Sequence, residues 1–416
     1  MAAAAATHAL CNPNLIREII QHLSPRGTKG DVTRSNIRAL ACCSRVNKTF
    51  SVNALDFLWE QLDSLLPVLK LLPSFVLKER HLQDELTDFS DDEEDTETDM
   101  DDDELIYDWA RLKQYAERVR LLGRISESST LTAVLSLLYY HNGGRPILPR
   151  LECLDWRITS TSSTGILALV PPSIRTLTIV FSNVTIDFVD DTFEDDPRHI
   201  GVDGTLWRAL SSLSALEAIE GNFKLVEDLP EGEEGFFALR EVALCGRVRD
   251  VNRLINTISS RHLESFSYQS HFVEENLTTY LILLTTVCTK LGSFLRVFKA
   301  RITFDAASVA SLDCFGRIIQ PLFSLSTLEN ITFMFYENNL PLSDKDMREI
   351  AKAFLGLKTF TIITYRMHEI VPSIEALMEF ARHCPRLEYL RLPAIHFANL
   401  SSRRKFRHTS HGLDVL

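Results

Sequence analysis

A short apolar pattern, apolar-x-x-apolar-x-apolar, recurs through the second part of this 416-residue chain and constrains its fold more than any other feature. Full copies begin at Leu151, Ile174, Leu239, Leu263, Leu328, Leu357 and Leu387, and weaker copies begin at Leu216 and Leu291. The alternation inside each copy predicts a strand with one buried face. The segments between them, such as 251–258, 306–315, 344–354 and 374–383, have helical spacing. The sequence therefore predicts a series of strand–helix units.

Neighbouring copies are 23 to 42 residues apart, and the longest interval contains an acidic insertion, residues 187–196. One unit of this size cannot bury its apolar face alone, so neighbours are expected to stack in chain order. The intervals and the pattern resemble those of leucine-rich repeats, although the asparagine expected after the strand is mostly missing. The predicted fold class is therefore α/β, with an irregular leucine-rich-repeat solenoid over residues 146–400.

The region before the repeats, residues 8–73, has the spacing of helices. Its first helix is expected to begin at Pro13 with Asn12 as its N-cap. That helix has an apolar face formed by Leu15, Ile16, Ile19, Ile20 and Leu23. Further helices are expected from residue 37 to 44 and from 55 to 69. The sequence thus predicts an all-α domain ahead of the repeats.

An acidic run separates these two regions. Residues 84–104 contain 14 Asp or Glu and no Lys or Arg, and they account for the formal net charge of −12 of the whole chain. Such a run repels itself and cannot bury apolar area, so we expect a disordered linker. Each of Ser90, Thr96 and Thr98 has an acidic residue three positions later, which makes them candidates for an acidophilic kinase. An inert spacer is the alternative.

Two further segments complete the expected organisation. Residues 105–145 are predicted to form a helical cap, with an amphipathic helix over 105–122 and a further helix over 130–140 that Asn142, Gly143 and Gly144 end. Residues 401–416 are predicted to be a basic, flexible tail, because 403–408 contain four Arg or Lys and one His. Nuclear import or anion binding is an alternative use for this tail.

No motif of an enzyme was found in the sequence. GxxxxGK[ST], GxGxxG, HExxH and GxSxG are all missing, so we expect no catalytic residues and no cofactor. The adjacent His383 and Cys384 lack the further ligands that a metal site needs. No basic stripe with interleaved aromatic residues suggests a nucleic-acid partner.

The cysteines and the apolar runs of the sequence indicate its compartment and bear on membrane contact. The eight cysteines contain no CxxC pair, and the N-terminus does not resemble a secretory signal, so we expect reduced, buried thiols in the cytoplasm or nucleus. The longest apolar run, residues 280–284, is too short to span a membrane.

Three stretches of the first region resemble an F-box, and more narrowly the F-box-like proteins of mushroom-forming fungi. Residues 12–23 are similar to the opening Pro-x-Leu-Leu-x-x-Ile-x-x-x-Leu helix of that family. Residues 40–50 resemble its Cys-x-x-Val-x-Lys/Arg-x-Trp/Phe core, and 54–59 resemble its closing Leu-Trp. Residues 62–73 and 115–120 are also similar to segments that precede the repeats in those proteins.

This resemblance implies a non-catalytic subunit of a Skp–cullin–F-box type ubiquitin ligase. The box would bind the Skp adaptor and, through it, the cullin, while the repeats would bind an unidentified protein substrate. It assigns to adaptor contact or to the box core the residues Pro13, Leu15, Ile16, Ile19, Ile20, Leu23, Val46 and Trp59. Some of these residues pack only within the box in the alternative interpretation, and a repeat scaffold without a ligase role is the alternative function. Exposed strand positions are candidates for substrate contact, namely Glu152, Asp155, Arg175, Thr178, Arg240, Glu388 and Arg391.

Overall fold

The structure of the chain is a computed structural model that divides into two compact units. The first unit is Met1–Arg157 with Thr164–Thr176, and the second is Ile158–Ser163 with Leu177–Leu416. The structure describes residues 12–24, 31–72, 102–126, 129–158, 163–181, 204–223, 234–270, 277–304, 315–335, 340–364, 369–396 and 414–415.

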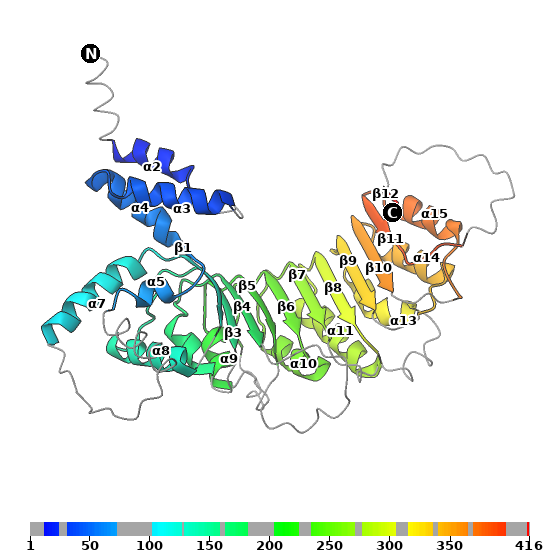
Figure 1. Cartoon of the computed structure of the whole chain (residues 1–416). Helices are drawn as coiled ribbons and strands as arrows, with labels where there is room; N and C mark the ends of the chain where they lie inside the picture. The colour runs from blue at the N-terminus through cyan, green and yellow to red at the C-terminus, as the bar shows by residue number, and fades with distance from the viewer. Residues whose placement is uncertain are drawn as a thin grey trace, which may run out of the picture. The chain divides into compact units, whose positions relative to one another are not determined.

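The first unit starts with three packed helices, α2 (Pro13–Gln21), α3 (Asp31–Cys43) and α4 (Lys48–Glu60) (Figure 1). Asn12 caps α2 as predicted, because its side chain accepts a hydrogen bond of 3.0 Å from the Asn14 N–H and Pro13 occupies the first turn. The shared core of the three helices consists of Ile16, Ile20, Leu40 and Ala54.

Short strands interrupt the rest of this unit. The elements after α4 are β1 (Gln61–Leu62), α5 (Leu66–Leu69), α7 (Asp102–Ala116), β2 (Leu121–Ser126), α8 (Ser129–His141), β3 (Cys153–Ile158) and η1 (Ser163–Ala168). Strand β1 pairs in parallel with β2, and β2 pairs in parallel with β3. Helix α8 ends as predicted, because Gly143 and Gly144 follow it with φ of 65° and 70°, which glycine adopts without strain.

The predicted fold class was wrong. An all-α domain followed by a leucine-rich-repeat solenoid was expected, whereas the described chain is an α/β fold with an open, all-parallel sheet. The strands β1 and β2 come from the segments 55–69 and 105–122, which were predicted to be wholly helical. Leu62 and Leu122 continue the helical spacing of their segments, but they pair with each other in the sheet. Pairing between distant segments has overridden the local period here.

The second unit alternates strands with helices. Its elements are β4 (Thr176–Phe181), α9 (Gly204–Ser211), β5 (Ala218–Asn222), β6 (Glu241–Cys245), α10 (Val248–Thr257), β7 (Ser265–Gln269), α11 (Leu277–Leu291), β8 (Val297–Ile302), α13 (Gly316–Ile319), η3 (Gln320–Ser324), β9 (Asn330–Phe335), α14 (Asp344–Ala353), β10 (Thr359–Thr364), α15 (Ile374–His383), β11 (Tyr389–Arg391) and β12 (Asp414–Val415). The strands from β5 to β12 lie in chain order and are parallel. In the described part of this unit, α10 and α11 lie along one face of the strands and the opposite face carries no helix (Figure 1).

Rows of side chains in register form the core of this unit. One buried row runs from β5 to β11 through Ile219, Val242, Phe266, Phe298, Ile331, Phe360 and Leu390. Its rings contact one another, with 6.1 Å between the centroids of Phe266 and Phe298. Each strand from β5 to β11 turns its second residue, and every alternate residue from it, toward this buried face. The residues between them lie on the other face and remain accessible, apart from Thr361 of β10, which is buried.

Most predicted strands are confirmed, but one was misplaced. The weak copy at Leu291 lies at the end of α11, and the strand that follows it, β8, belongs to a copy beginning at Leu295. The helices predicted over 251–258, 344–354 and 374–383 correspond to α10, α14 and α15. The helix predicted over 306–315 and the acidic insertion 187–196 lie outside the described residues, apart from Phe315.

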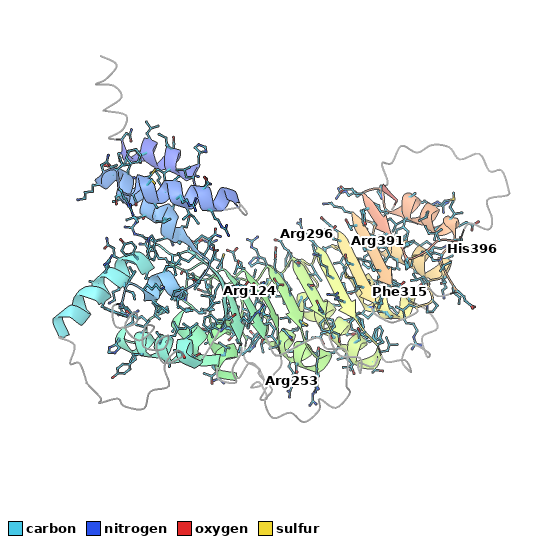
Figure 2. All side chains as sticks on the ribbon, viewed as in Figure 1. Arg124, Arg253, Arg296, Phe315, Arg391 and His396 are labelled. Atoms are coloured by element: carbon cyan, nitrogen blue, oxygen red, sulfur yellow. The ribbon has the colours of Figure 1, made fainter. Side chains whose placement is uncertain are left out.

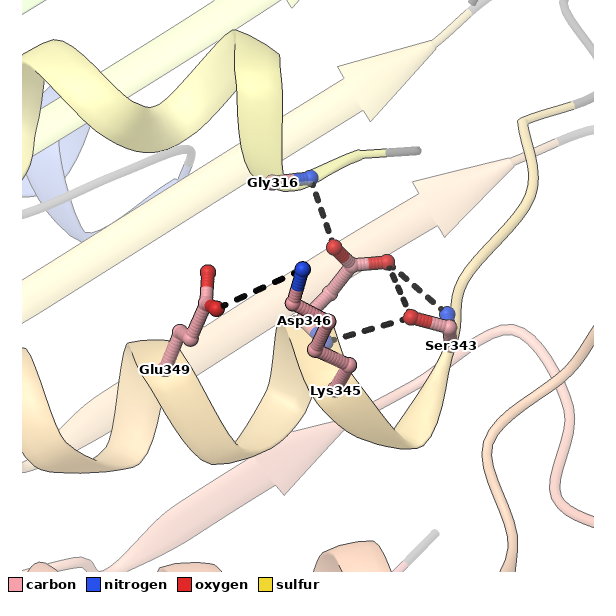
Figure 3. Close-up of polar contacts among 5 residues, drawn as sticks. All are labelled: Gly316, Ser343, Lys345, Asp346 and Glu349. Carbon is pink, nitrogen blue, oxygen red and sulfur yellow. Dashed lines mark hydrogen bonds and ion pairs between the residues drawn. The ribbon is translucent and has the colours of Figure 1, made fainter. Parts of the chain in front are cut away.

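The carboxylates of Asp344 and Asp346 at the start of α14 tie this helix to two neighbouring elements, and Figure 3 shows the contacts of the buried Asp346. Ser343 and Asp346 form a capping box, in which Asp346 accepts from the Ser343 N–H at 2.9 Å and Ser343 Oγ accepts from the Asp346 N–H at 3.2 Å. The second oxygen of Asp346 accepts from the Gly316 N–H of α13 at 3.1 Å. Asp344 accepts from the Ser373 hydroxyl at 2.8 Å, and Ser373 is the N-cap of α15. These hydrogen bonds fix α13, α14 and α15 against one another.

Candidate functional site

The first helix, α2, divides its apolar residues between its own core and solvent. Ile16 and Ile20 are buried against Leu40 of α3 and Ala54 of α4. Leu15 is 38% exposed and Ile19 is 49% exposed. Leu15 and Ile19 are four residues apart, so they lie on the same side of the helix one turn from each other. We call these two side chains the α2 patch.

The eight residues assigned to adaptor contact or the box core therefore fall into separate environments. Pro13, Leu15, Ile19 and Val46 are exposed, the last of these at 62%. Ile16 and Ile20 are buried, and Leu23 packs partly buried against the same core. Trp59 is half-buried and contacts Tyr115 of α7, with 4.6 Å between ring centroids. Only the exposed group is available to a partner without unfolding the helices.

Two exposed apolar residues of the same helices were missed. Ile37 of α3 is 38% exposed, although its spacing placed it on the buried face of the predicted helix. Val52 of α4 is exposed beside the buried Asn53 and Ala54. Its spacing gave no signal of this exposure, because Val52 lies three residues before Leu55 and so continues the apolar face of the helix.

A polar hollow of about 370 Å³ lies next to Val52 in the first unit. Arg118 crosses it, forming an ion pair with Asp56 and donating to the Val52 carbonyl at 3.4 Å. The hollow is lined by Arg17, Val52, Asp56, Glu60, Gln114, Glu117, Arg118, Arg120 and Arg150. Its lining carries charges of both signs, and the ion pair between Arg118 and Asp56 holds α4 against the residues that follow α7.

The residues that precede the strands form a ladder of alternating charge, which we call the charge ladder. In the second unit it runs through Glu217, Arg240, Glu264, Arg296, Glu329, Lys358 and Glu388. Each backbone N–H donates to the carbonyl of the preceding member, at 2.7 to 2.9 Å. The first unit repeats the arrangement, because Arg120 donates to the Glu60 carbonyl and Glu152 donates to the Arg120 carbonyl. Opposite charges are thus neighbours along both series.

Side chains of the charge ladder pair with one another. Lys358 lies 2.7 Å from Glu329, and Arg240 lies 3.4 Å from Glu264. The hydrogen bond from Lys358 is the largest influence that lowers the pKa of Glu329, and the charges of Lys358 and Arg296 lower it further against the opposing effect of burial. Neighbouring side chains of the charge ladder therefore neutralise much of one another's charge.

The face of the strands opposite the helices is accessible in the described part of the second unit. Its middle carries small polar side chains, such as Ser265 and Ser267 on β7 and Thr332 on β9. Arg296 and Arg391 lie on this side of the strands, opposite to Arg253 of α10 (Figure 2).

The strand positions predicted for substrate contact are spread over several settings. Glu152, Arg175, Arg240 and Glu388 precede strands and occupy positions of the ladder type. Asp155 pairs with Arg124 at 3.5 Å in the first unit. Thr178 lies on β4 and Arg391 on β11, and Arg391 is exposed. The structure does not gather these residues into one site.

The thiols differ in exposure more than predicted. The six described cysteines are all free; Cys384 is buried, Cys42 is exposed, and the other four are intermediate. Burial raises the pKa of Cys384 and of Cys288 to about 11. The prediction that all thiols are buried was therefore wrong for Cys42. Cys11 and Cys314 lie outside the described residues.

Several other predictions fall outside what the structure describes. Ser90, Thr96 and Thr98 lie there, as do residues 401–413 of the predicted tail and most of the predicted acidic linker. Within the described ranges, no three His, Cys, Asp or Glu side chains are grouped as metal ligands would be. Nor do these ranges contain a helix with the length and apolar character that crossing a membrane requires.

Comparison with models of known protein families and with curated proteins gives no match for this chain. The arguments for its function therefore rest on its own residues and on the resemblance of residues 12–59 to an F-box.

Proposed function

We propose that the chain is a non-catalytic substrate-recognition subunit of a Skp–cullin–F-box type ubiquitin ligase. Helices α2 to α4 bind a Skp-type adaptor, and the accessible face of the strands in the second unit binds a protein substrate. The complex would act in the cytoplasm or nucleus.

One observation carries this proposal, the exposed α2 patch on helices that already have a core. A helix with Ile16 and Ile20 buried has no need of further apolar residues to fold. Exposed apolar residues one turn apart are the anchors with which a helix enters a partner's groove. Full burial of an exposed Ile or Leu side chain contributes about 1.5–3 kcal/mol, and Leu15 and Ile19 are 38% and 49% exposed, so together they contribute about 1–3 kcal/mol to such a contact.

Binding of a purified fungal Skp-type adaptor to the full chain tests the proposal. We expect the wild-type chain to retain the adaptor, and Ile19→Asp to weaken it about 100-fold, because the variant loses apolar burial and places a charge in the contact. The matched control is Ile282→Asp on α11, where an isoleucine of similar exposure, 53%, lies far along the chain. That variant should bind like the wild type.

The choice of Ile19 matters because Ile16→Asp would place a charge in the core of the helices and unfold them. Circular dichroism of Ile19→Asp and Ile282→Asp is the check that both variants are folded. If the wild-type chain fails to bind the adaptor, or if Ile19→Asp binds normally, the ligase role is refuted and an interaction scaffold without ligase role is favoured.

A further inference from the structure

We propose that the accessible face of β8 to β11 binds an acidic protein segment in an extended conformation. This inference rests on the proposed function in one respect only, namely that the segment belongs to the substrate. The surface itself is argued from the register and charge of the strands in the second unit.

Charges of opposite sign are segregated along this face. In the described strands from β8 to β11, every charged residue at an accessible position is basic: Lys299, Arg301 and Arg391. On β5 and β6 the charged residues at accessible positions are both acidic, Glu220 and Glu241. The accessible positions of β7 between them are uncharged. A partner that covers the described strands β8 to β11 therefore contacts basic residues but no acidic ones, apart from the charge ladder at the strand starts.

The register places two of these cations at a defined separation. Lys299 is in register with Thr332, Thr332 with Thr361, and Thr361 with Arg391. Lys299 and Arg391 are thus three strand spacings apart, or about 14 Å at about 4.8 Å per spacing. An extended chain advances about 3.3 Å per residue, so about four residues cover this distance. Acidic residues at positions i and i+4 of an extended segment match both cations.

The uncharged side chains between them suit a peptide. Thr332 offers a hydroxyl within the row itself, and Asn330 and Thr359 lie two residues before Thr332 and Thr361 on their strands. Such groups both donate and accept hydrogen bonds, as the amides of an extended backbone require. The cations at accessible positions of these strands are few, namely Lys299, Arg301 and Arg391, which suits a short acidic peptide better than a nucleic acid, whose affinity depends on many phosphate contacts.

Fluorescence anisotropy with the full chain at low salt tests this surface. The probe is a fluorescein-labelled peptide of four Glu-Ser-Gly-Ser repeats, which places a glutamate at every fourth position. A peptide with Lys in place of Glu and a single-stranded oligo-dT of equal length are the comparison probes. We expect the wild type to bind the Glu peptide at least about tenfold more tightly than either comparison probe.

Two charge-reversed variants separate this surface from general electrostatics. Lys299→Glu with Arg391→Glu should lose at least about tenfold in affinity for the Glu peptide and should now prefer the Lys peptide. Lys345→Glu with Lys352→Glu makes the same change in net charge on exposed positions of α14, and it should bind like the wild type.

The proposal is overturned if the wild type does not prefer the Glu peptide, if both double variants lose equal affinity, or if oligo-dT binds as well as the Glu peptide. These outcomes are independent of the adaptor experiment, because no adaptor is present in the anisotropy assay. Conversely, loss of adaptor binding in Ile19→Asp should leave the affinity for the Glu peptide unchanged.

Discussion

Removal of the Asp346 carboxylate should open the helical layer around α14. Asp346 is 2% exposed and accepts three hydrogen bonds, from the Gly316 N–H, the Ser343 N–H and the Ser343 hydroxyl. Asp346→Ala leaves both N–H groups without this acceptor. The side chain serves two elements at once, since it closes the capping box of its own helix and holds the start of α13.

The magnitude follows from the setting of each donor. A buried N–H left without a partner costs about 1–3 kcal/mol, which applies in full to Gly316 because that residue is buried. Ser343 is only half-buried and water can replace the lost acceptor, so its share is the usual cost of a lost N-cap, about 1 kcal/mol. We therefore expect a loss of about 3 kcal/mol for Asp346→Ala. Asp346→Asn keeps one oxygen for Gly316 and should lose about 1–2 kcal/mol.

Hydrogen exchange read by mass spectrometry is the suitable assay, because a chain of two units need not unfold in one step. A loss of 3 kcal/mol corresponds to exchange roughly 100-fold faster in α13 and α14. Lys345→Ala is the matched control, since Lys345 is exposed and its ion pair with Glu349 spans 4.0 Å. Exchange in Asp346→Ala within threefold of the wild type, or an equal change in the control, would refute the reasoning.

Two further predictions concern titrating groups. The pKa of Glu329 is lowered, so this carboxylate stabilises the fold above the usual carboxylate pKa, and the stabilisation is lost as the pH falls below that value. The melting temperature of Glu329→Gln should therefore fall less than that of the wild type between about pH 5 and pH 3. The raised pKa of Cys384, about 11, together with its burial, should leave it unmodified by iodoacetamide at pH 8 in the native chain. Peptide mapping should find the exposed Cys42 alkylated under the same conditions, and alkylation of Cys384 at an equal rate would contradict this assignment.

The strands of the second unit could be predicted because their alternation survives in the sequence. Leu239, Val242 and Leu244 mark β6 without ambiguity, and the same spacing marks most other strands. Strand β8 was misplaced because its copy of the pattern, Leu295-x-x-Phe298-x-Ala300, ends in Ala300, which is too small to stand out in an apolar pattern. The apolar pair Leu291 and Phe294 then looked like the better match, although Phe294 is exposed.

The strands of the first unit could not be predicted by the same means. Strand β1 has two residues, and only Leu62 of these is apolar. Its strand conformation comes from pairing with β2, almost sixty residues later in the chain. The residues around β1 do not indicate a partner so distant in the sequence, and the apolar spacing of the preceding helix continues across β1.

The apolar face of α2 could be predicted from its spacing, but not its division into the buried Ile16 and Ile20 and the exposed α2 patch. Five apolar residues in eleven form a stripe wider than one neighbouring helix covers. Leu15 and Ile16 are adjacent in sequence and about 100° apart around the helix, so only the position of α4 decides which of them is buried. That position depends on packing that the spacing does not contain.

The arrangement of charge separates the groups that hold the strands together from those that can vary. Opposite charges in the charge ladder pair between neighbouring strands, so a reversal at Arg240 or Lys358 would place like charges side by side and oppose stacking. Lys299 and Arg391 instead lie on exposed positions whose neighbours in register, Thr332 and Thr361, are uncharged. Reversal of Lys299 and Arg391 therefore creates no like-charged neighbour in their row. Substitutions on the accessible face can therefore change which partner binds, while the buried rows and the charge ladder preserve the fold.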